Sequence, residues 1–324
     1  MKISRLLALV LLGLAAAAQR SSAQDMPLSM LLIDGEDWQL VADKLGAADA
    51  AFSDDKGNFY FSDMRSAEGI FKIGLDGKIT PCLQSTNAAR ISGMKFAPDG
   101  RLYGCRGATK QLLAFEVPGG AMTVLAEDVQ PNDLVVTHKG HIYFTETSKH
   151  QVTFVNPKTG EKKAVDVGIT APNGITLSAD QGTLAVSDYR GPYVWTFRIN
   201  ADGSLSAKSP YMTMRTEVDV NAKSEDGRSP VYKTSCAGDG MTTDVQGRYY
   251  VTTSLGLQIY DPTGRMCGVL PKPSDKGMPS VGFGGLNLEY LYVLCGDKIF
   301  RRKTKASGVV SFKPPAAELP AKKK

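Results

Sequence analysis

Hydrophobic and polar residues alternate along six separate segments of this chain. In each segment an apolar alternating stretch leads into a turn with glycine or an equivalent residue, and a second alternating stretch follows. Alternation over about four to eight residues is typical of β-strands that bury one face. The six segments span residues 51–63, 94–106, 134–146, 175–188, 241–254 and 281–297.

Each segment continues into a third and a fourth alternating stretch, joined by a short turn such as Asp76-Gly77 or Gly119-Gly120. Turns of this kind are typical of β-hairpins. Four antiparallel strands repeated at about 40 residues indicate blades packed around a central channel. We therefore predict an all-β fold, a six-bladed β-propeller of four-stranded antiparallel blades. Residues 30–42 precede the first unit, and we expect them to supply a strand that closes the ring against the last blade.

A polar and charged stretch at residues 214–237 interrupts the repeat between the fourth and fifth units. Connections of this length in compact domains are usually functional or disordered. Two interpretations stay open at this point: a lid over the channel mouth, or a plain insertion on the surface.

The first 23 residues have the features of a secretory signal peptide. Lys2 and Arg5 precede an apolar stretch at 6–18, and Ser21-Ser22-Ala23 matches a small-residue cleavage pattern. The apolar stretch is too short to span a bilayer, and no later one approaches that length. We expect an exported protein, periplasmic or secreted and without a membrane span. The propeller would cover residues 24–312 and a basic disordered tail residues 313–324.

The charge and the cysteine content argue against several classes of function. The formal net charge of +5 comes from the two ends of the chain, since residues 24–300 carry a net charge of −5. This balance argues against a nucleic-acid-binding protein. The five cysteines form no C-x-x-C pair, which argues against a zinc knuckle or a redox motif, and we expect most of them to be unpaired.

One repeat position carries a carboxylate or amide side chain in four of the six units. It lies two residues before the first apolar residue of each unit and reads Asp49, Ser92, Asn132, Asn173, Asp239 and Pro279. Each Asp or Asn alone would be interpreted as a turn residue, but equivalent positions of a radial repeat face one axis. Oxygen ligands without imidazole or thiolate suit a hard cation. We predict one divalent metal bound by Asp49, Asn132, Asn173 and Asp239, with calcium favoured and zinc, magnesium or manganese as alternatives.

Other catalytic motifs are missing. The three histidines, His138, His141 and His150, lie in one unit, and there is no G-x-S-x-G sequence to support Ser-His-Asp catalysis. The phosphate-binding sequence G-x-x-x-x-G-K-[ST] is also absent.

Several stretches occur in the order of one known family over nearly the whole mature chain. They are Pro131-Asn132-Asp133-Leu134 with the following Gly140 to Glu146, then Pro172-Asn173-Gly174-Ile175, Gly238-Asp239-Gly240-Met241 and Phe283-Gly284-Gly285. In these stretches the chain resembles the senescence-marker-protein, gluconolactonase and luciferin-regenerating-enzyme-like family. The resemblance implies a six-bladed propeller with one catalytic divalent metal in its channel, and hydrolysis of sugar lactones.

The resemblance also implies roles for individual residues. Asn173 and Asp239 look like metal ligands, and Asn132 resembles a residue that binds metal directly or through water and also touches substrate. The family usually has Glu at the first-blade ligand, where this chain has Asp49, so the metal would shift or a water would intervene. Gln130 stands where the family often has a basic residue, and we assign it with Asn132 to substrate binding.

The chemistry expected from such a site is metal-assisted hydrolysis of a small-molecule lactone. The metal would polarise the carbonyl while a metal-associated water attacks it, with Asp239 as general base. Two alternatives remain. One is a non-catalytic, metal-stabilised propeller that binds a sugar or a protein, and the other is a phosphotriesterase-like hydrolase that uses the same metal.

Overall fold

The fold is described from a computed structural model, which covers residues 26–66 and 69–315 of the 324-residue chain. The predicted signal peptide at residues 1–23 lies outside these ranges, as do residues 316–324 of the predicted tail.

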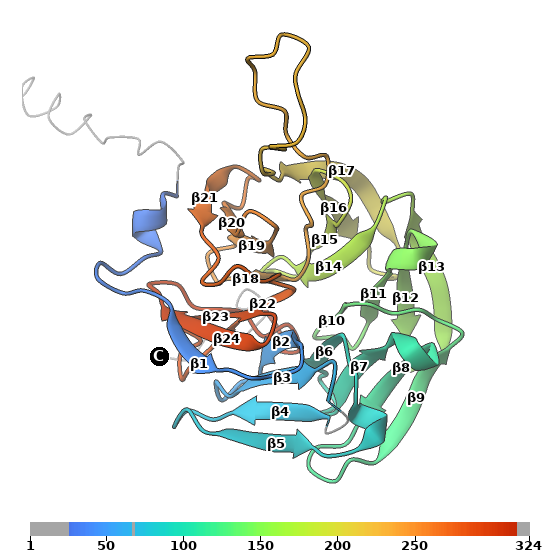
Figure 1. Ribbon diagram of the computed structural model, residues 1–324. Coiled ribbons are helices and arrows are strands. Elements are labelled where there is room, and N and C mark those ends of the chain that lie inside the picture. Colours follow the sequence, from blue (N-terminus) through green and yellow to red (C-terminus); the bar gives the residue numbers. More distant parts are fainter. Residues whose placement is uncertain (1–25, 67–68, 316–324) are drawn as a thin grey trace, which may run out of the picture.

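Among the described residues, 24 β-strands form six four-stranded sheets around a central axis (Figure 1). The prediction of a six-bladed β-propeller with antiparallel blades is thus confirmed. No helix in the described ranges is long and apolar enough to cross a membrane.

Blades 1 to 3 follow one another along the chain. Blade 1 contains β2 (Ala48–Ser53), β3 (Phe59–Asp63), β4 (Ile70–Ile73) and β5 (Ile79–Leu83). Blade 2 contains β6 (Gly93–Phe96), β7 (Leu102–Arg106), β8 (Gln111–Phe115) and β9 (Met122–Glu127). Blade 3 contains β10 (Leu134–Val136), β11 (Ile142–Glu146), β12 (Gln151–Asn156) and β13 (Glu161–Val167).

Blades 4 to 6 complete the ring. Blade 4 contains β14 (Pro172–Leu177), β15 (Thr183–Asp188), β16 (Tyr193–Ile199) and β17 (Leu205–Thr213). Blade 5 contains β18 (Met241–Thr243), β19 (Tyr249–Thr252), β20 (Leu257–Tyr260) and β21 (Met266–Leu270). Blade 6 contains β22 (Ser280–Gly284), β23 (Tyr290–Cys295), β24 (Lys298–Lys303) and β1 (Gln39–Ala42). Short 3-10 helices lie at η1 (Leu28–Met30), η2 (Thr86–Ala88), η3 (Gly107–Thr109) and η4 (Thr147–Lys149).

The ring closes through the N-terminal strand β1. This strand pairs antiparallel with β24, with Gln39 opposite Arg301 and Leu40 opposite Phe300. Blade 6 therefore holds both ends of the propeller in one sheet, which confirms the closure predicted for residues 30–42.

The hydrophobic core lies between the blades. Six buried clusters each combine side chains from two neighbouring blades. Between blades 6 and 1, for example, Phe59 stacks on Tyr292 with ring centroids 4.2 Å apart. A single blade cannot bury both of its faces, so apolar burial at the six interfaces stabilises the ring as a whole.

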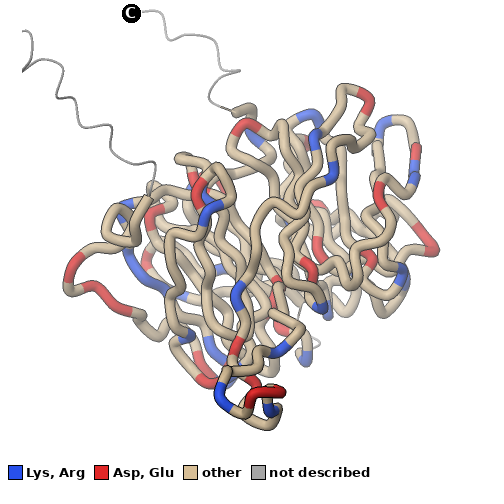
Figure 2. Tube along the Cα trace, turned by 90° about the horizontal axis from the view of Figure 1, so that it is seen from above, with Lys and Arg blue, Asp and Glu red and all other residues tan. Residues whose placement is uncertain are grey.

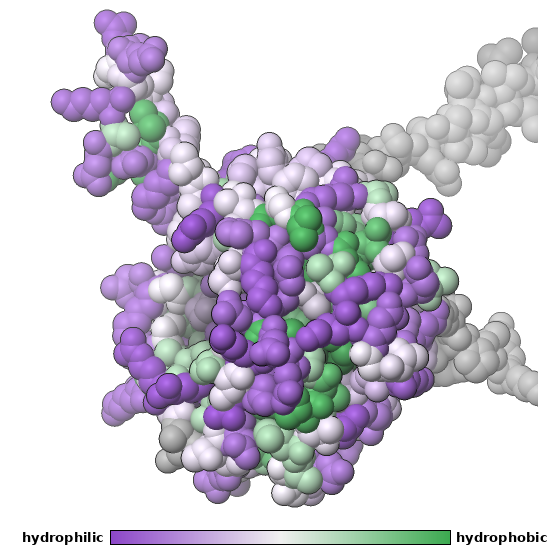
Figure 3. Space-filling model, turned by 90° about the vertical axis from the view of Figure 1, so that its right-hand side faces the viewer, coloured by the Kyte–Doolittle hydropathy of each residue, from purple (hydrophilic) through white to green (hydrophobic). Residues whose placement is uncertain are grey.

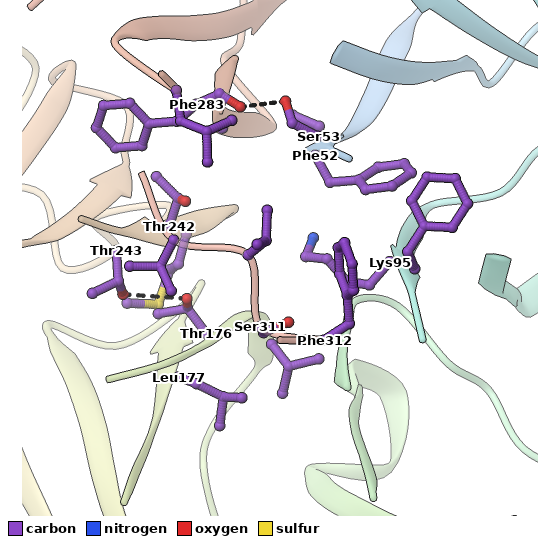
Figure 4. Close-up of a pocket in the computed structure, with 18 of the residues that line it drawn as sticks. Phe52, Ser53, Lys95, Thr176, Leu177, Thr242, Thr243, Phe283, Ser311 and Phe312 are labelled. Carbon is purple, nitrogen blue, oxygen red and sulfur yellow. Dashed lines mark hydrogen bonds between the residues drawn. The ribbon is translucent and has the colours of Figure 1, made fainter. Parts of the chain in front are cut away.

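One end of the channel is closed by the C-terminal segment, residues 304–315. Val309, Phe312 and the residues between them share a cavity of about 50 Å³ with the ends of the inner strands β2, β6, β10, β14, β18 and β22 (Figure 4). Gln181 Nε2 donates to the carbonyl oxygens of Ser311 and Lys313 at 2.8 and 2.9 Å. Lys313 also pairs with Asp55 at 2.7 Å. These contacts anchor the chain across the channel as far as Lys313.

Residues 214–237 form an arm that projects from the body beside blades 4 and 5 (Figures 1 and 3). Val218 bridges to Tyr232 across the arm, and Lys233 pairs with Glu217 at 2.5 Å. The arm points outward and leaves the channel axis uncovered, so the structure favours a surface insertion over a lid.

The cysteines pack as small apolar residues. Cys82, Cys105, Cys236 and Cys295 are free thiols, and the last three of these are buried. Burial raises the pKa of Cys295 to about 12, which suppresses the reactive thiolate. The expectation of mostly unpaired cysteines is confirmed.

We expect Phe59→Ala to lower the free energy of unfolding by about 3 to 5 kcal/mol, because it removes a buried ring between the first and last blades. Tyr232→Ala in the exposed arm is the matched control and should change it by less than about 0.5 kcal/mol. Urea unfolding followed by circular dichroism measures both. An equal loss in the two variants would contradict the role given to inter-blade packing.

Candidate active site at the channel mouth

The four residues of the predicted ring lie where the inner strands begin. Asp49 and Asn173 are the second residues of β2 and β14, and Asn132 and Asp239 lie two residues before β10 and β18. The opposite ends of these strands line the cavity at the closed end of the channel. The ring residues therefore lie at the other end, which we call the mouth.

Three of these residues are held through their backbones by the preceding blade. The hydroxyl of Ser92 donates to the carbonyl oxygen of Asn132 at 2.6 Å. Thr145 donates in the same way to Asn173 at 2.6 Å, and Ser187 to Asp239 at 2.8 Å. Each hydroxyl crosses from one blade to the next. The spacing of the ring residues is therefore fixed by hydrogen bonds between blades as well as by strand pairing.

Close packing of the inner strands explains the glycine that follows two ring residues. A Cβ at Gly174 would lie 2.0 Å from the carbonyl oxygen of Asp239, and one at Gly240 would lie 2.6 Å from that of Pro279. Any larger residue would push neighbouring strands apart. The Asn-Gly and Asp-Gly pairs of the sequence thus mark sites where adjacent blades approach each other at the mouth.

Three carboxylates at the mouth, those of Asp49, Asp133 and Asp239, have raised pKa values. Burial raises the pKa of Asp49 to about 7, a hydrogen bond from the Ala50 amide opposes this, and the charge of Asp133 adds to it. Burial holds the pKa of Asp239 well above its ordinary value, and the charges of Asp49 and Asp133 raise it further. Like charges at close range in a poorly solvated site disfavour ionisation. Without a bound cation, the mouth therefore retains protons near neutral pH.

Asp133 was not predicted from the sequence to belong to this group. Burial raises its pKa, although the amides of Leu134 and Ile175 donate to its carboxylate at 2.8 and 3.3 Å. It stands one residue after the ring position, where three other units have glycine. That departure from the repeat is the signal that could have identified it.

Lys95 supplies positive charge close to two of these carboxylates. It lies on the inner strand β6, and its charge lowers the pKa of Asp49 and of Asp133. Its ammonium group points into the channel, above the ring of Phe52 at 5.8 Å from the centroid (Figure 4). One lysine cannot neutralise three carboxylates.

The donor set fits a hard cation. The described residues contain no group of three or more His, Cys, Asp or Glu side chains arranged to hold an ion. An ion at the mouth would therefore need the amide oxygens of Asn132 and Asn173 beside the carboxylates of Asp49 and Asp239. A divalent cation favours the ionised form of poorly solvated carboxylates, and oxygen-only ligation suits calcium. The assignment of these four residues as ligands stays a prediction.

Gln130, assigned to substrate binding from the sequence, lies beside the mouth with its side chain engaged. Its Oε1 accepts a hydrogen bond from the hydroxyl of Ser148, and its backbone N–H donates to Glu146 at 2.7 Å. Its contact with substrate, and that of Asn132, also stay predictions.

Residues 47–296 match the family described as the SMP-30/Gluconolactonase/LRE-like region. The chain belongs to this family. The resemblance recognised in the sequence motifs is thereby confirmed.

Two relatives support this membership. A gluconolactonase from Zymomonas mobilis is 23% identical over 242 residues, which cover 67% of this chain and 64% of the relative. A lactonase from Staphylococcus haemolyticus is 24% identical over 186 residues, which cover 53% and 57%. The match to this chain thus spans less than two thirds of the length of each relative.

Solved structures share the fold. A gluconolactonase from Xanthomonas campestris aligns with a TM-score of 0.71 and 17% identity over 86% of this chain and 92% of that one. A calcium-binding regucalcin from Agrobacterium tumefaciens aligns with a TM-score of 0.67 and 14% identity over 85% and 96%. At these identities the likeness shows the propeller fold alone.

The carboxylate pKa values predict how stability depends on pH. Because the pKa of Asp49 is raised to about 7 in the fold, the folded state retains a proton that the unfolded state has lost. The cation-free protein should therefore lose stability as pH rises from about 5 to 8. Added calcium should raise the thermal midpoint more at pH 8 than at pH 5.

Asp49→Asn is the matched variant, since it removes this titration while leaving other groups in place. The difference in thermal midpoint between wild type and Asp49→Asn isolates the contribution of Asp49 from that of the histidines. A difference that does not change over this pH range would contradict the proton retention inferred at the mouth.

Thr145→Val should remove the hydroxyl bond to Asn173 and leave its carbonyl without that donor. We expect a loss of about 1 to 3 kcal/mol in the free energy of unfolding and weaker calcium binding. Chemical denaturation and calorimetric titration measure the two effects. Thr145→Ser keeps the hydroxyl and is the control, so wild-type behaviour of Thr145→Val would show that this bond does not position the ring.

Proposed function

We propose that this protein is an exported hydrolase of sugar lactones that depends on a divalent cation, with calcium favoured. Family membership and the two lactonase relatives support the reaction class. The observation that carries the proposal is the position of Asp239 at the mouth. Its pKa is held well above its ordinary value by burial and by two neighbouring carboxylates. Functional sites often contain such shifted groups.

The cation would be held by Asp49, Asn173 and Asp239, with Asn132 binding it directly or through water. When bound, it would supply a Lewis acid for the lactone carbonyl and the positive charge that favours ionised carboxylates. The same oxygen ligands accept magnesium, manganese or zinc, so each of these ions belongs in the test.

The residues of the mouth perform the remaining steps. Asn132 orients the lactone through its amide group. Asp239, once ionised, accepts a proton from the attacking water as the new C–O bond forms. The ring ester bond then breaks, and the proton passes from Asp239 to the departing ring oxygen. The product is the open-chain hydroxy acid.

The C-terminal segment limits access to this site. It crosses the far end of the channel and is tied to Gln181 and Asp55. Substrate therefore enters, and product leaves, through the mouth.

Export is proposed from the apolar stretch at residues 6–18 and the small residues that follow it. Fractionation of cells that express the whole chain tests this proposal. We expect the protein outside the cytoplasm with an N-terminus near Gln24, and the chain without residues 1–23 should stay in the cytoplasm. Full-length protein in the cytoplasm would contradict export.

Asp239→Asn keeps an oxygen ligand of the same shape but removes the base. We expect lactone turnover to fall by at least about 10², while calcium still binds more weakly than in wild type. A panel of sugar lactones, assayed with each of the four cations and with chelator, measures turnover. Calorimetry measures calcium binding. Asp43→Asn, on the exposed approach to β2, is the matched control and should behave as wild type.

Near wild-type turnover by Asp239→Asn would exclude the proposed base. Hydrolysis of phosphotriesters in place of lactones would instead support a phosphotriesterase. Wild-type protein that binds calcium but hydrolyses neither class would support a binding propeller.

A further inference from the structure

A pocket opens beside the ring, between blades 3 and 4, with a volume of about 540 Å³. Asn173, a proposed ligand of the cation, forms part of its wall. The rest of the wall comes mainly from the segment that follows β11 and the segment that follows β15, and includes Thr147, Ser148, His150, Tyr189 and Arg190. A lactone whose carbonyl lies at the ring can therefore extend its other end into this pocket.

This pocket carries positive charge, whereas the ring of proposed ligands is acidic. Arg190 lines it, and no Asp or Glu is among its lining residues. Within the described residues, no carboxylate lies within ion-pair distance of Arg190. The nearby carboxylate of Asp188 is buried and already accepts hydrogen bonds from four backbone amides, Thr170, Ala171, Arg190 and Gly191. The guanidinium group of Arg190 is thus available to a ligand.

Three other polar side chains of the wall are already engaged. The hydroxyl of Thr147 donates to the carbonyl oxygen of Pro172 at 2.6 Å, and that of Ser148 donates to Gln130. His150 Nδ1 lies 2.5 Å from the carbonyl oxygen of Thr170. A carbonyl only accepts, so Nδ1 carries a proton and Nε2 remains for a ligand. The groups left for recognition are the guanidinium of Arg190, Nε2 of His150, the amide of Asn173 and the hydroxyls of Thr170 and Tyr189. Of these, only the guanidinium carries a fixed positive charge.

The backbone that carries Arg190 is held in place before any ligand binds. Its N–H donates to Asp188 at 3.1 Å, and the N–H of Tyr189 donates to the carbonyl oxygen of Ala171 at 2.8 Å. At the base of the projecting arm, Ser235 donates its hydroxyl to the carbonyl oxygen of Tyr189 at 2.6 Å. Because the backbone is fixed, only the side chain of Arg190 has to be ordered when an anion binds.

We infer that this pocket binds an anionic group of the substrate, and that the substrates are sugar lactones with a carboxylate remote from the lactone carbonyl. This inference rests on the proposed lactone hydrolysis at the ring. An unpaired guanidinium offers two parallel donors to a carboxylate, whereas a neutral lactone leaves that charge unused. The pocket lies beside the three acidic side chains of the mouth, so an anionic substituent needs a local positive group to approach the ring.

The test compares two lactones of the same ring size, one with a terminal carboxylate and one with a neutral hydroxymethyl group. We expect Arg190→Gln to raise KM for the acidic lactone at least about tenfold, with kcat nearly unchanged, and to leave KM for the neutral lactone within about twofold. Arg198→Gln, at another exposed arginine of blade 4 that lies outside this pocket, is the control and should change neither. High salt should weaken the wild-type preference for the acidic lactone.

A binding measurement separates this inference from the proposed reaction. Calorimetry should show that an open-chain sugar dicarboxylate binds calcium-loaded wild type at least about tenfold more tightly than the corresponding monocarboxylate, and that Arg190→Gln removes the difference. Equal affinities in wild type, or equal changes in KM for both lactones, would overturn the inference. Absence of lactone hydrolysis would overturn the proposed function, while the difference in binding would still decide the role of Arg190.

Discussion

Repulsion among poorly solvated carboxylates is the constraint around which the mouth of this propeller is built. Asp49, Asp133 and Asp239 come from three blades, and loss of solvation disfavours the ionised form of each. The charge of Asp133 raises the pKa of Asp49 and of Asp239 further, and the charge of Asp49 adds to the rise at Asp239. Lys95 offsets only part of this charge. Proteins tolerate such an arrangement when the groups retain protons or when a cation neutralises them. The proposed cation dependence and the proposed base both follow from this electrostatic condition.

The carboxylates stay together because the fold prevents their separation. Hydroxyl groups of one blade hold the backbone of ring residues in the next, as Thr145 does for Asn173 and Ser187 does for Asp239. Glycines such as Gly174 let the inner strands approach so closely that any Cβ would collide with a neighbouring carbonyl. Separating the carboxylates would break these bonds and the apolar interfaces between blades. Packing free energy thus maintains an electrostatically unfavourable site, as is common where a site is functional.

Much of the fold followed from local patterns in the sequence. Alternation and turn glycines predicted the six blades, and the early stretch at 30–42 predicted the closing strand, because both depend on the short-range period of a strand. The shared register also identified residues that lie where the inner strands begin. Asp133 was missed because it stands one residue outside that register. Lys95 was missed because, within a strand, a lysine that faces the channel cannot be told from one that faces solvent.

Other features depend on contacts between distant parts of the chain. The C-terminal segment closes the channel through hydrogen bonds from Gln181, which is 130 residues away from Ser311 in sequence. No local pattern indicates such a partner. The direction of the arm at 214–237 likewise depends on packing at its base. The pocket at Arg190 forms because loops of two neighbouring blades lie side by side in the fold, and the sequence of neither loop alone indicates it.

Proton release on calcium binding tests the central claim most directly. Calorimetric titration at pH 7 in two buffers of different ionisation enthalpy gives the number of protons released per ion. Because the carboxylates of the mouth retain protons when no cation is bound, binding should release about one proton or more per ion, and Asp239→Asn should release fewer. Calcium binding without proton release, or with the same release from Asp239→Asn, would contradict the account of the mouth as a proton-retaining cation site.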